Sequence, residues 1–341
     1  MPHASSIALT RRGLIAGAAA AVAMPRGAWA QEPARVDRLS PALDRIIAPD
    51  TRIDTIATGI AWAEGPLWVA RERALFFSDP PANIMRRWRA QDGASVFLTP
   101  SGAAGTDRKL VREPGSNGLA LAPGGAALLV ADSGSRAVVH LDLGTRRRTT
   151  LADRYRGKRF NSPNDLCLAR SGAIYFTDPP YGLVGEDASS LREQPVNGVY
   201  RLAPDGEVAL LDGTLTRPNG IALSPDQRRL YVSVSDAAAP RIMVYDLDAN
   251  GMPTASRVFL DATTLHGPGL PDGMKVAADG TLFCSAPGGL YVLTPEAQPL
   301  GRVANGGPIA NCCFGEGGQT LFMAANHSVL RLPLMIDGWR A

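Results

Sequence analysis

Six times along the chain, a polar residue with a side-chain oxygen stands at the start of a short apolar run. A Gly or Asp turn and a second apolar run follow, as in "PNGIALSPDQRRLYVSV" from Pro218. Alternating polarity and β-branched residues predict that both runs are β-strands. The six polar residues, called the anchor residues below, are Glu64, Asn117, Asn164, Asn219, Asp272 and Asn311.

Successive anchor residues are 53, 47, 55, 53 and 39 residues apart. A third strand-like run often follows the first two, and a fourth closes several units. Six units of four short antiparallel strands predict an all-β fold, a six-bladed β-propeller. A β-sandwich or two smaller β-domains are the alternatives, but neither has a reason to repeat a polar residue at the start of every unit.

The last unit ends before a fourth strand, because only a short tail follows "SVLRLPL" (328–334). The strand-like stretch "TRIDTIATG" (51–59) precedes the first anchor residue and has no unit of its own. We expect it to pair with the last blade, which closes the ring and removes an exposed edge. The predicted propeller domain therefore spans residues 51–341, and residues 31–50 are an N-terminal extension.

Residues 1–30 have the layout of a secretory signal. The pair Arg11–Arg12 precedes an apolar run, Leu14–Met24, and "AWA" at 28–30 supplies a small-x-small end. The arginine pair indicates the twin-arginine export machinery as a partner and a periplasmic location. A membrane anchor is the alternative, but the apolar run is shorter than the roughly 20 residues that a spanning helix needs.

Charge and cysteine content narrow the class of protein further. Removing residues 1–30 takes away three arginines and no acid, so the net charge of +3 falls to 0. A neutral mature chain gives no support for binding nucleic acid or an anionic membrane. The four cysteines lie within apolar runs and form no CxxC or His/Cys cluster, so we expect buried free thiols instead of a zinc site.

The anchor residues carry the chemistry of the predicted propeller. The first strand of each blade lines the central channel, so these side chains should converge there. All six offer oxygen, and carboxylates mixed with amide oxygens suit a hard divalent cation such as Ca²⁺ or Mg²⁺. Turn chemistry is the alternative for a single Asn-Gly or Asp-Gly, and it explains Asn117 and Asn311 equally well. It does not explain Glu64 or the three Asx residues in "NSPND".

Several separate motifs resemble the gluconolactonase / senescence marker protein / luciferin-regenerating enzyme family. They are "WAEGPLW" (62–68), "GKRFNSPNDLCL" (157–168), "YFTDPPYGL" (175–183), "RPNGIALSPD" (217–226), "PDGMKV" (271–276) and "CCFG" (312–315). "FNSPND" and "TDPPYGL" are similar to the bacterial gluconolactonase branch in particular. The resemblance covers nearly all of the chain after the signal.

This resemblance implies a six-bladed propeller that hydrolyses sugar lactones, with other esters or organophosphates as substrates of relatives. It implies one divalent metal bound by Glu64, Asn219 and Asp272, with Asn164 contacting the metal directly or through water. One departure from the family pattern limits what the resemblance implies about substrate binding. Animal members carry an arginine two residues before the Asn of "PND", where this chain has Ser162, so their sugar contacts are not transferred.

Lactone opening needs a polarised carbonyl and an activated water. We expect Asp272 to act as both metal ligand and general base. Asp165 is the alternative base, although a strand-capping role facing away explains it equally well. Asn117 and Tyr181 are the expected substrate contacts, and Tyr181 belongs to a polar, turn-rich segment (178–198) that is expected to lie over the channel mouth as a lid.

A plain surface loop is the alternative for the segment 178–198. His266 and His327 have places in the sequence from which they could approach the channel, but a surface or packing role is expected for both.

The sequence thus predicts an exported metal-dependent hydrolase that opens D-glucono-1,5-lactone or a similar aldonolactone. Ca²⁺ is the expected ion, with Mg²⁺, Mn²⁺ or Zn²⁺ as alternatives. An aryl-ester or phosphotriester hydrolase on the same metal is one competing hypothesis. A non-enzymatic binding propeller stabilised by the ion is another, but such a platform has no need of Glu64.

Overall fold

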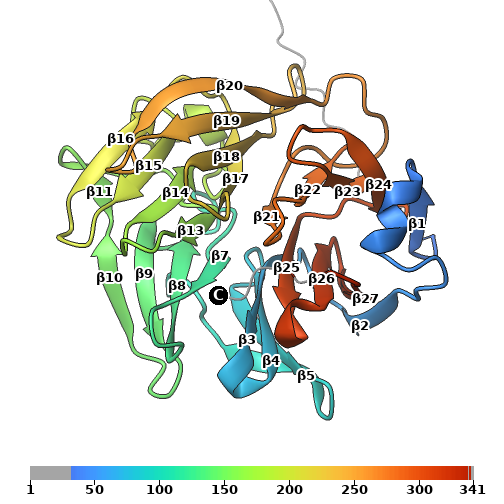
Figure 1. The fold of residues 1–341 in the computed structure, drawn as a ribbon. Helices are drawn as coiled ribbons and strands as arrows, with labels where there is room; N and C mark the ends of the chain where they lie inside the picture. The colour runs from blue at the N-terminus through green and yellow to red at the C-terminus, as the bar shows by residue number, and fades with distance from the viewer. Residues whose placement is uncertain (1–31, 337, 339–341) are drawn as a thin grey trace, which may run out of the picture.

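The computed structural model describes residues 32–336 and 338. These residues form six antiparallel sheets set around a common axis (Figure 1). The innermost strands contact one another in ring order, from β3 through β7, β13, β17, β21 and β25 back to β3. The predicted six-bladed β-propeller is therefore confirmed.

Each of the first four blades uses one continuous stretch of chain, with the innermost strand first. Blade 1 contains β3 (Glu64–Val69), β4 (Ala74–Asp79), β5 (Ile84–Arg89) and β6 (Gly93–Leu98). Blade 2 contains β7 (Ser116–Leu121), β8 (Ala127–Asp132), β9 (Ala137–Asp142) and β10 (Arg148–Ala152). Blade 3 contains β13 (Leu166–Leu168), β14 (Ile174–Asp178), β15 (Gly198–Leu202) and β16 (Val208–Asp212). Blade 4 contains β17 (Pro218–Leu223), β18 (Arg229–Val234), β19 (Arg241–Leu247) and β20 (Pro253–Asp261).

The last two blades each take a strand from the N-terminal part of the chain. Blade 5 contains β21 (Met274–Val276), β22 (Leu282–Ala286), β23 (Gly289–Leu293), β24 (Pro299–Ala304) and, beyond them, β1 (Arg35–Arg38). Blade 6 contains β25 (Asn311–Gly315), β26 (Thr320–Ala325), β27 (Ser328–Pro333) and β2 (Asp54–Thr58). The predicted closure is confirmed, because β2 pairs antiparallel with β27, with Asp54 opposite Arg331.

The short elements lie between or beside the blades. They are the 3₁₀ turns η1 (Pro41–Arg45), η2 (Ala70–Glu72), η3 (Glu186–Ala188) and η4 (Glu316–Gly318), and the two-stranded ribbon of β11 (Arg154–Tyr155) and β12 (Lys158–Arg159). The residues predicted to be an N-terminal extension include β1 and η1, and η1 buries Leu43 completely. The predicted export signal lies outside the described residues. None of the helices described is long and apolar enough to cross a membrane.

Six apolar clusters fill the spaces between the faces of neighbouring blades, one for each blade boundary. The boundary between the last and first blades is typical: Phe322 of β26 stacks on Trp68 of β3 with ring centroids 5.5 Å apart. Because each blade is packed on both faces, its middle strands read as continuous apolar runs, such as "ALFF" from Ala74. The ring of packed faces fixes where the innermost strands lie.

Candidate active site at one end of the propeller axis

Each anchor residue is the first or second residue of its innermost strand or stands two positions before it. In β3, the pairing register with the next strand shifts between Glu64 and Leu67. The same irregularity falls at Asn117 in β7 and at Asn219 in β17. A local break in the hydrogen-bond pattern between two strands changes the direction of a side chain. The side chains of Glu64, Asn117 and Asn219 can therefore face the end of the axis.

The glycines after several anchors are explained by close packing between blades. A Cβ on Gly118 would overlap the Asp165 backbone beside Asn164, and a Cβ on Gly220 would overlap the Asp272 carbonyl. Neither glycine has a positive φ. The turn interpretation of these Asn-Gly pairs is therefore wrong, and glycine is needed because the next blade leaves no room for a side chain.

Hydroxyl groups on the second strands hold the anchors of the following blades. Thr177 of β14 donates to the carbonyl of Asn219 at 2.6 Å, and Ser233 of β18 donates to the carbonyl of Asp272 at 2.6 Å. Ser285 of β22 donates to Ala310, directly before the sixth anchor, at 3.1 Å. These bonds satisfy carbonyls that lie outside the regular strand pairing. They also fix the position of each anchor along the propeller axis relative to the neighbouring blade.

Glu64 lies buried in a cavity of about 740 Å³ at this end of the axis. The Trp62 indole N–H donates to Glu64 Oε1 at 3.2 Å, and the Gly65 amide donates to Oε2 at 3.1 Å. Burial, followed by the negative charge of Asp165, raises the pKa of Glu64 to about 7. A cation bound nearby would favour the charged form of this carboxylate and lower its pKa.

Asp272, Asn164 and Asn219 line the same cavity as Glu64. Burial raises the pKa of Asp272 well above its usual range, and the charge of Glu64 raises it further. Asn219 donates its Nδ2 to Ser235 Oγ at 2.9 Å, which leaves Oδ1 as an acceptor. That oxygen is buried and has no hydrogen-bond partner among the described residues.

The two predicted substrate contacts also line this cavity. Asn117 is 3% exposed, and its Oδ1 is a second buried oxygen that lacks a partner within residues 32–336. Tyr181 enters from the loop after β14, and burial raises the pKa of its hydroxyl. The structure thus brings Glu64, Asn117, Asn164, Asn219, Asp272 and Tyr181 to one place.

Asp165 and the sixth anchor, Asn311, are directed elsewhere. Asp165 accepts the Leu166 amide at 2.8 Å and the Asn311 Nδ2 at 3.3 Å, and neither residue lines the cavity. Asn311 uses its Oδ1 to accept the Cys312 amide at 2.8 Å. The positive charge of Lys275 acts on Asp165 and counters the rise in its pKa that burial causes.

The residues of the cavity fit a hard divalent cation. Two carboxylates share a buried space with amide oxygens that have no donor, and each such oxygen costs about 1–3 kcal/mol when left unsatisfied. A cation can satisfy the Asn219 oxygen and remove the repulsion between the carboxylates. Within the described part of the chain, no group of three or more His, Cys, Asp or Glu side chains could hold a metal, so a metal site here depends on the amides.

Sequence reasoning missed several residues of the cavity. Glu113 lines it from the loop before β7, and its buried Oε2 has no partner among the described residues. Arg112 and His266 line it as well, although His266 was expected to have a surface or packing role. Nothing local marks Glu113 except its place four residues before Asn117. His327 lies outside the cavity lining, with Nδ1 3.0 Å from the carbonyl oxygen of Ile60.

The segment 178–198 is tied to the rim of the cavity. The Arg112 amide donates to the Gly182 carbonyl at 2.8 Å. Glu186 of η3 forms ion pairs with Arg112 at 3.0 Å and with Arg217 at 3.2 Å. These contacts reach Arg112 before β7 and Arg217 before β17, so the segment that carries Tyr181 is held from both neighbouring blades.

A six-bladed propeller with a cluster of carboxylate and amide oxygens at one end of its axis defines the class of this protein. Residues 62–327 match the family described as the SMP-30/Gluconolactonase/LRE-like region, and the chain belongs to that family. This confirms the resemblance predicted from the sequence motifs.

Individual relatives are similar over most of their length. A gluconolactonase of Zymomonas mobilis is 50% identical over 305 residues, which cover 87% of this chain and 85% of that one. The solved structure of a gluconolactonase from Xanthomonas campestris has a TM-score of 0.77 at 31% identity, covering 89% and 96% of the two chains. A calcium-binding regucalcin from Agrobacterium tumefaciens shares the fold, with a TM-score of 0.66 at 18% identity over 84% and 94%.

Proposed function

We propose that this chain is a metal-dependent lactonase that opens a sugar lactone to the aldonic acid, with D-glucono-1,5-lactone or a similar aldonolactone as the substrate. Lactone hydrolysis is supported by the similarity to the Zymomonas and Xanthomonas gluconolactonases. The observation that carries the proposal is the pair of carboxylates that line one cavity, Glu64 and Asp272, beside the amide oxygen of Asn219, which has no partner among the described residues.

In this proposal Glu64, Asn164, Asn219 and Asp272 hold one divalent ion, with Ca²⁺ favoured because every donor is a hard oxygen. Such an ion, when bound, supplies Lewis acidity toward the lactone carbonyl. Trp62 orients the Glu64 carboxylate through its indole N–H. The hydroxyl of Ser233 fixes the backbone of Asp272, so the ligand set is largely built before any ion arrives.

Asp272 is the proposed general base, because its carboxylate lines the cavity where a substrate would lie. Asp165 is the less favoured choice, since both of its oxygens accept hydrogen bonds within the protein. Asn117 and Tyr181 are proposed to contact the hydroxyl-bearing carbons of the sugar. Asn117 Oδ1 is an acceptor without a donor among residues 32–336, which suits a substrate hydroxyl.

A pH-stat assay tests this function. Lactones, aryl esters and phosphotriesters are offered to the metal-stripped protein and to the same protein refilled with Ca²⁺, Mg²⁺, Mn²⁺ or Zn²⁺. We expect aldonolactone hydrolysis that vanishes on stripping and returns on refilling. Hydrolysis of aryl esters or phosphotriesters alone would shift the substrate class, and no hydrolysis with any metal would favour a binding propeller.

We also propose that residues 1–30 direct export to the periplasm through the twin-arginine machinery. The support is the pair Arg11–Arg12 ahead of a short apolar run and the small residues at 28 and 30. Cell fractionation and mass spectrometry of the mature chain test this. We expect a periplasmic protein that begins at Gln31, and we expect a change of both arginines to lysine to block its export.

A further inference from the structure

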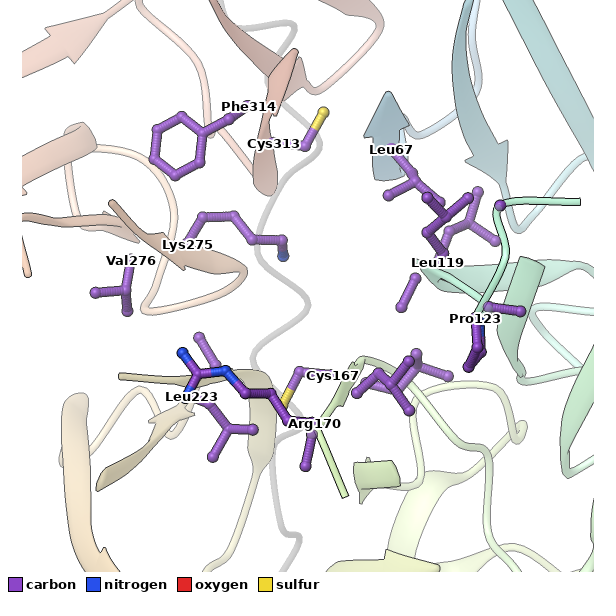
Figure 2. A pocket seen from close by; sticks show the side chains of 18 of the residues that line it. Leu67, Leu119, Pro123, Cys167, Arg170, Leu223, Lys275, Val276, Cys313 and Phe314 are labelled. Carbon is purple, nitrogen blue, oxygen red and sulfur yellow. The ribbon is translucent and has the colours of Figure 1, made fainter. Parts of the chain in front are cut away.

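A second cavity, of about 630 Å³, lies toward the ends of the innermost strands, away from the anchor residues at their starts. Figure 2 shows side chains that line it. This cavity shares no lining residue with the candidate active site. The two cavities use different parts of the same innermost strands. Anchor residues at the strand starts form the first, and residues two to four positions further along form the second. Its volume lies within the range of about 300–1,000 Å³ typical of small-molecule sites.

The wall of this second cavity is apolar. Four blades contribute an aliphatic residue at the same position of the repeat, four residues after the anchor. They are Leu121, Leu168, Leu223 and Val276. Three of these, the leucines, are only partly buried. They pack against the clusters between the blades and also line the cavity. The wall continues with Leu67 of blade 1, Leu119 of blade 2 and Phe314 of blade 6 (Figure 2).

Every charged residue that lines the cavity, within the described chain, is a cation: Lys275, Arg71 and Arg170. Lys275 is the central one, because its side chain projects between the innermost strands (Figure 2). Within the described residues, the Lys275 ammonium makes one hydrogen bond, to the Met274 carbonyl at 3.0 Å. An ammonium has three donors. Two of them remain for a ligand, although the charge of Lys275 also interacts with buried Asp165.

We propose that this cavity binds an amphipathic carboxylate, with its alkyl chain against the ring of leucines and its carboxylate paired with Lys275. Most of the lining residues are apolar, although Ser224 and Gln227 also contribute. This composition suits an alkyl chain more than a sugar, which separates this ligand from the proposed substrate at the other end. The two remaining donors of the Lys275 ammonium can pair with the two oxygens of a carboxylate, and Arg71 and Arg170 add positive charge to the same lining.

Decanoate and decanol are the probes, used below their aggregation limits in calorimetric titration of the full chain. We expect saturable 1:1 binding of decanoate, about fourfold tighter for each methylene added from octanoate upward. Decanol should bind at least tenfold more weakly than decanoate. Equal affinity for decanoate and decanol would contradict the proposed pairing of the carboxylate with Lys275. The absence of saturable decanoate binding would overturn the whole proposal.

Lys275→Met removes the charge and shortens the unbranched side chain by only one atom. We expect decanoate affinity to fall at least tenfold while decanol affinity stays unchanged, and the matched change of exposed Lys158 to Met should alter neither. If K275M unfolds, Ala120→Phe replaces it, because Ala120 lines the cavity and the larger ring occupies the space of the alkyl chain. Unchanged decanoate binding in a folded K275M or A120F protein would contradict the proposal.

Discussion

Ser233 Oγ and the carbonyl oxygen of Asp272 are 2.6 Å apart, across the boundary between blades 4 and 5. The hydroxyl belongs to the second strand of one blade and the carbonyl to the anchor residue of the next. The same relationship joins Thr177 to Asn219 one blade earlier. The candidate ligands are therefore positioned by their neighbours in the ring as much as by their own strands.

The first prediction concerns this support. Ser233→Ala leaves the buried Asp272 carbonyl without its donor, so the free energy of unfolding should fall by about 1–3 kcal/mol. Metal affinity should weaken as well, because Asp272 loses its fixed backbone. Urea unfolding and metal titration measure the two effects. The change of exposed Ser256 in β20 to Ala is the control, with an expected effect within about 0.5 kcal/mol.

The second prediction identifies Glu64 as a ligand. Glu64→Gln keeps the shape of the side chain and removes one negative charge, so divalent-metal affinity should drop by at least tenfold. Calorimetric titration of Ca²⁺ into the stripped protein measures it. Exposed Glu207→Gln serves as the matched control and should bind the ion like the parent. Equal affinities in the two variants would exclude Glu64 from the ligand set.

The third prediction separates the two candidate bases. Asp272→Asn retains an oxygen ligand but cannot accept a proton near neutral pH, so lactonase activity at metal saturation should fall by about 10²–10⁴-fold. Asp165→Asn should have a much smaller effect on the rate at saturating metal. Full recovery of the Asp272 variant at high metal, with loss in the Asp165 variant, would reverse the assignment.

Much of this site was predictable because its residues sit inside repeated motifs. Glu64, Asn219 and Asp272 precede apolar runs in the same way, and the ring of blades brings such positions together. The orientation of Asn311 was not predictable. It precedes its strand like the others, yet its amide bonds to Asp165 and Cys312 instead of lining the cavity. Only the packing of opposite blades decides whether such a side chain lines the cavity or forms hydrogen bonds inside the protein.

Two other features escaped prediction for physical reasons. Strand β1 reads "RVDR", which is short and polar because it adds to the outer edge of blade 5 and buries little. Glu113 comes from a loop, where no periodicity marks which side chains face a cavity.

The fourth prediction is a pH dependence of stability. Asp178 is fully buried and accepts the amides of Asn161 and Ser162, and burial raises its pKa to about 7. The native state keeps this proton to higher pH than the unfolded chain, in which the pKa of Asp is about 4. Its contribution to stability is therefore complete below about pH 4 and is lost as pH rises to about 7, by up to about 4 kcal/mol.

Asp178→Asn should remove that slope. Urea unfolding at pH 5 and pH 7.5 measures the difference in the parent and in the variant, and exposed Asp92→Asn is the control that should keep the parental slope. A variant with the slope of the parent would show that another group carries the dependence.

The fifth prediction concerns closure of the ring. Deleting residues through Gly59 removes β1, η1 with its buried Leu43, and β2, and exposes the edge of β27, so the melting temperature should fall by about 10 °C or more. Deletion through Arg38 removes β1 alone and should have a smaller effect, since β1 only extends blade 5. Scanning calorimetry of the two truncated chains compares them, and equal melting temperatures would contradict a special role for β2.

The pairing of β2 with β27 also governs how the chain can fold. The two strands come from opposite ends of the described sequence, so the ring cannot be completed until the last blade has been synthesised. Contacts of such long sequence separation form slowly. Until then the growing chain presents an unpaired apolar blade face at each end, where two unfinished molecules could pair with each other. Aggregation during synthesis, more than instability of the finished ring, is the hazard built into this architecture.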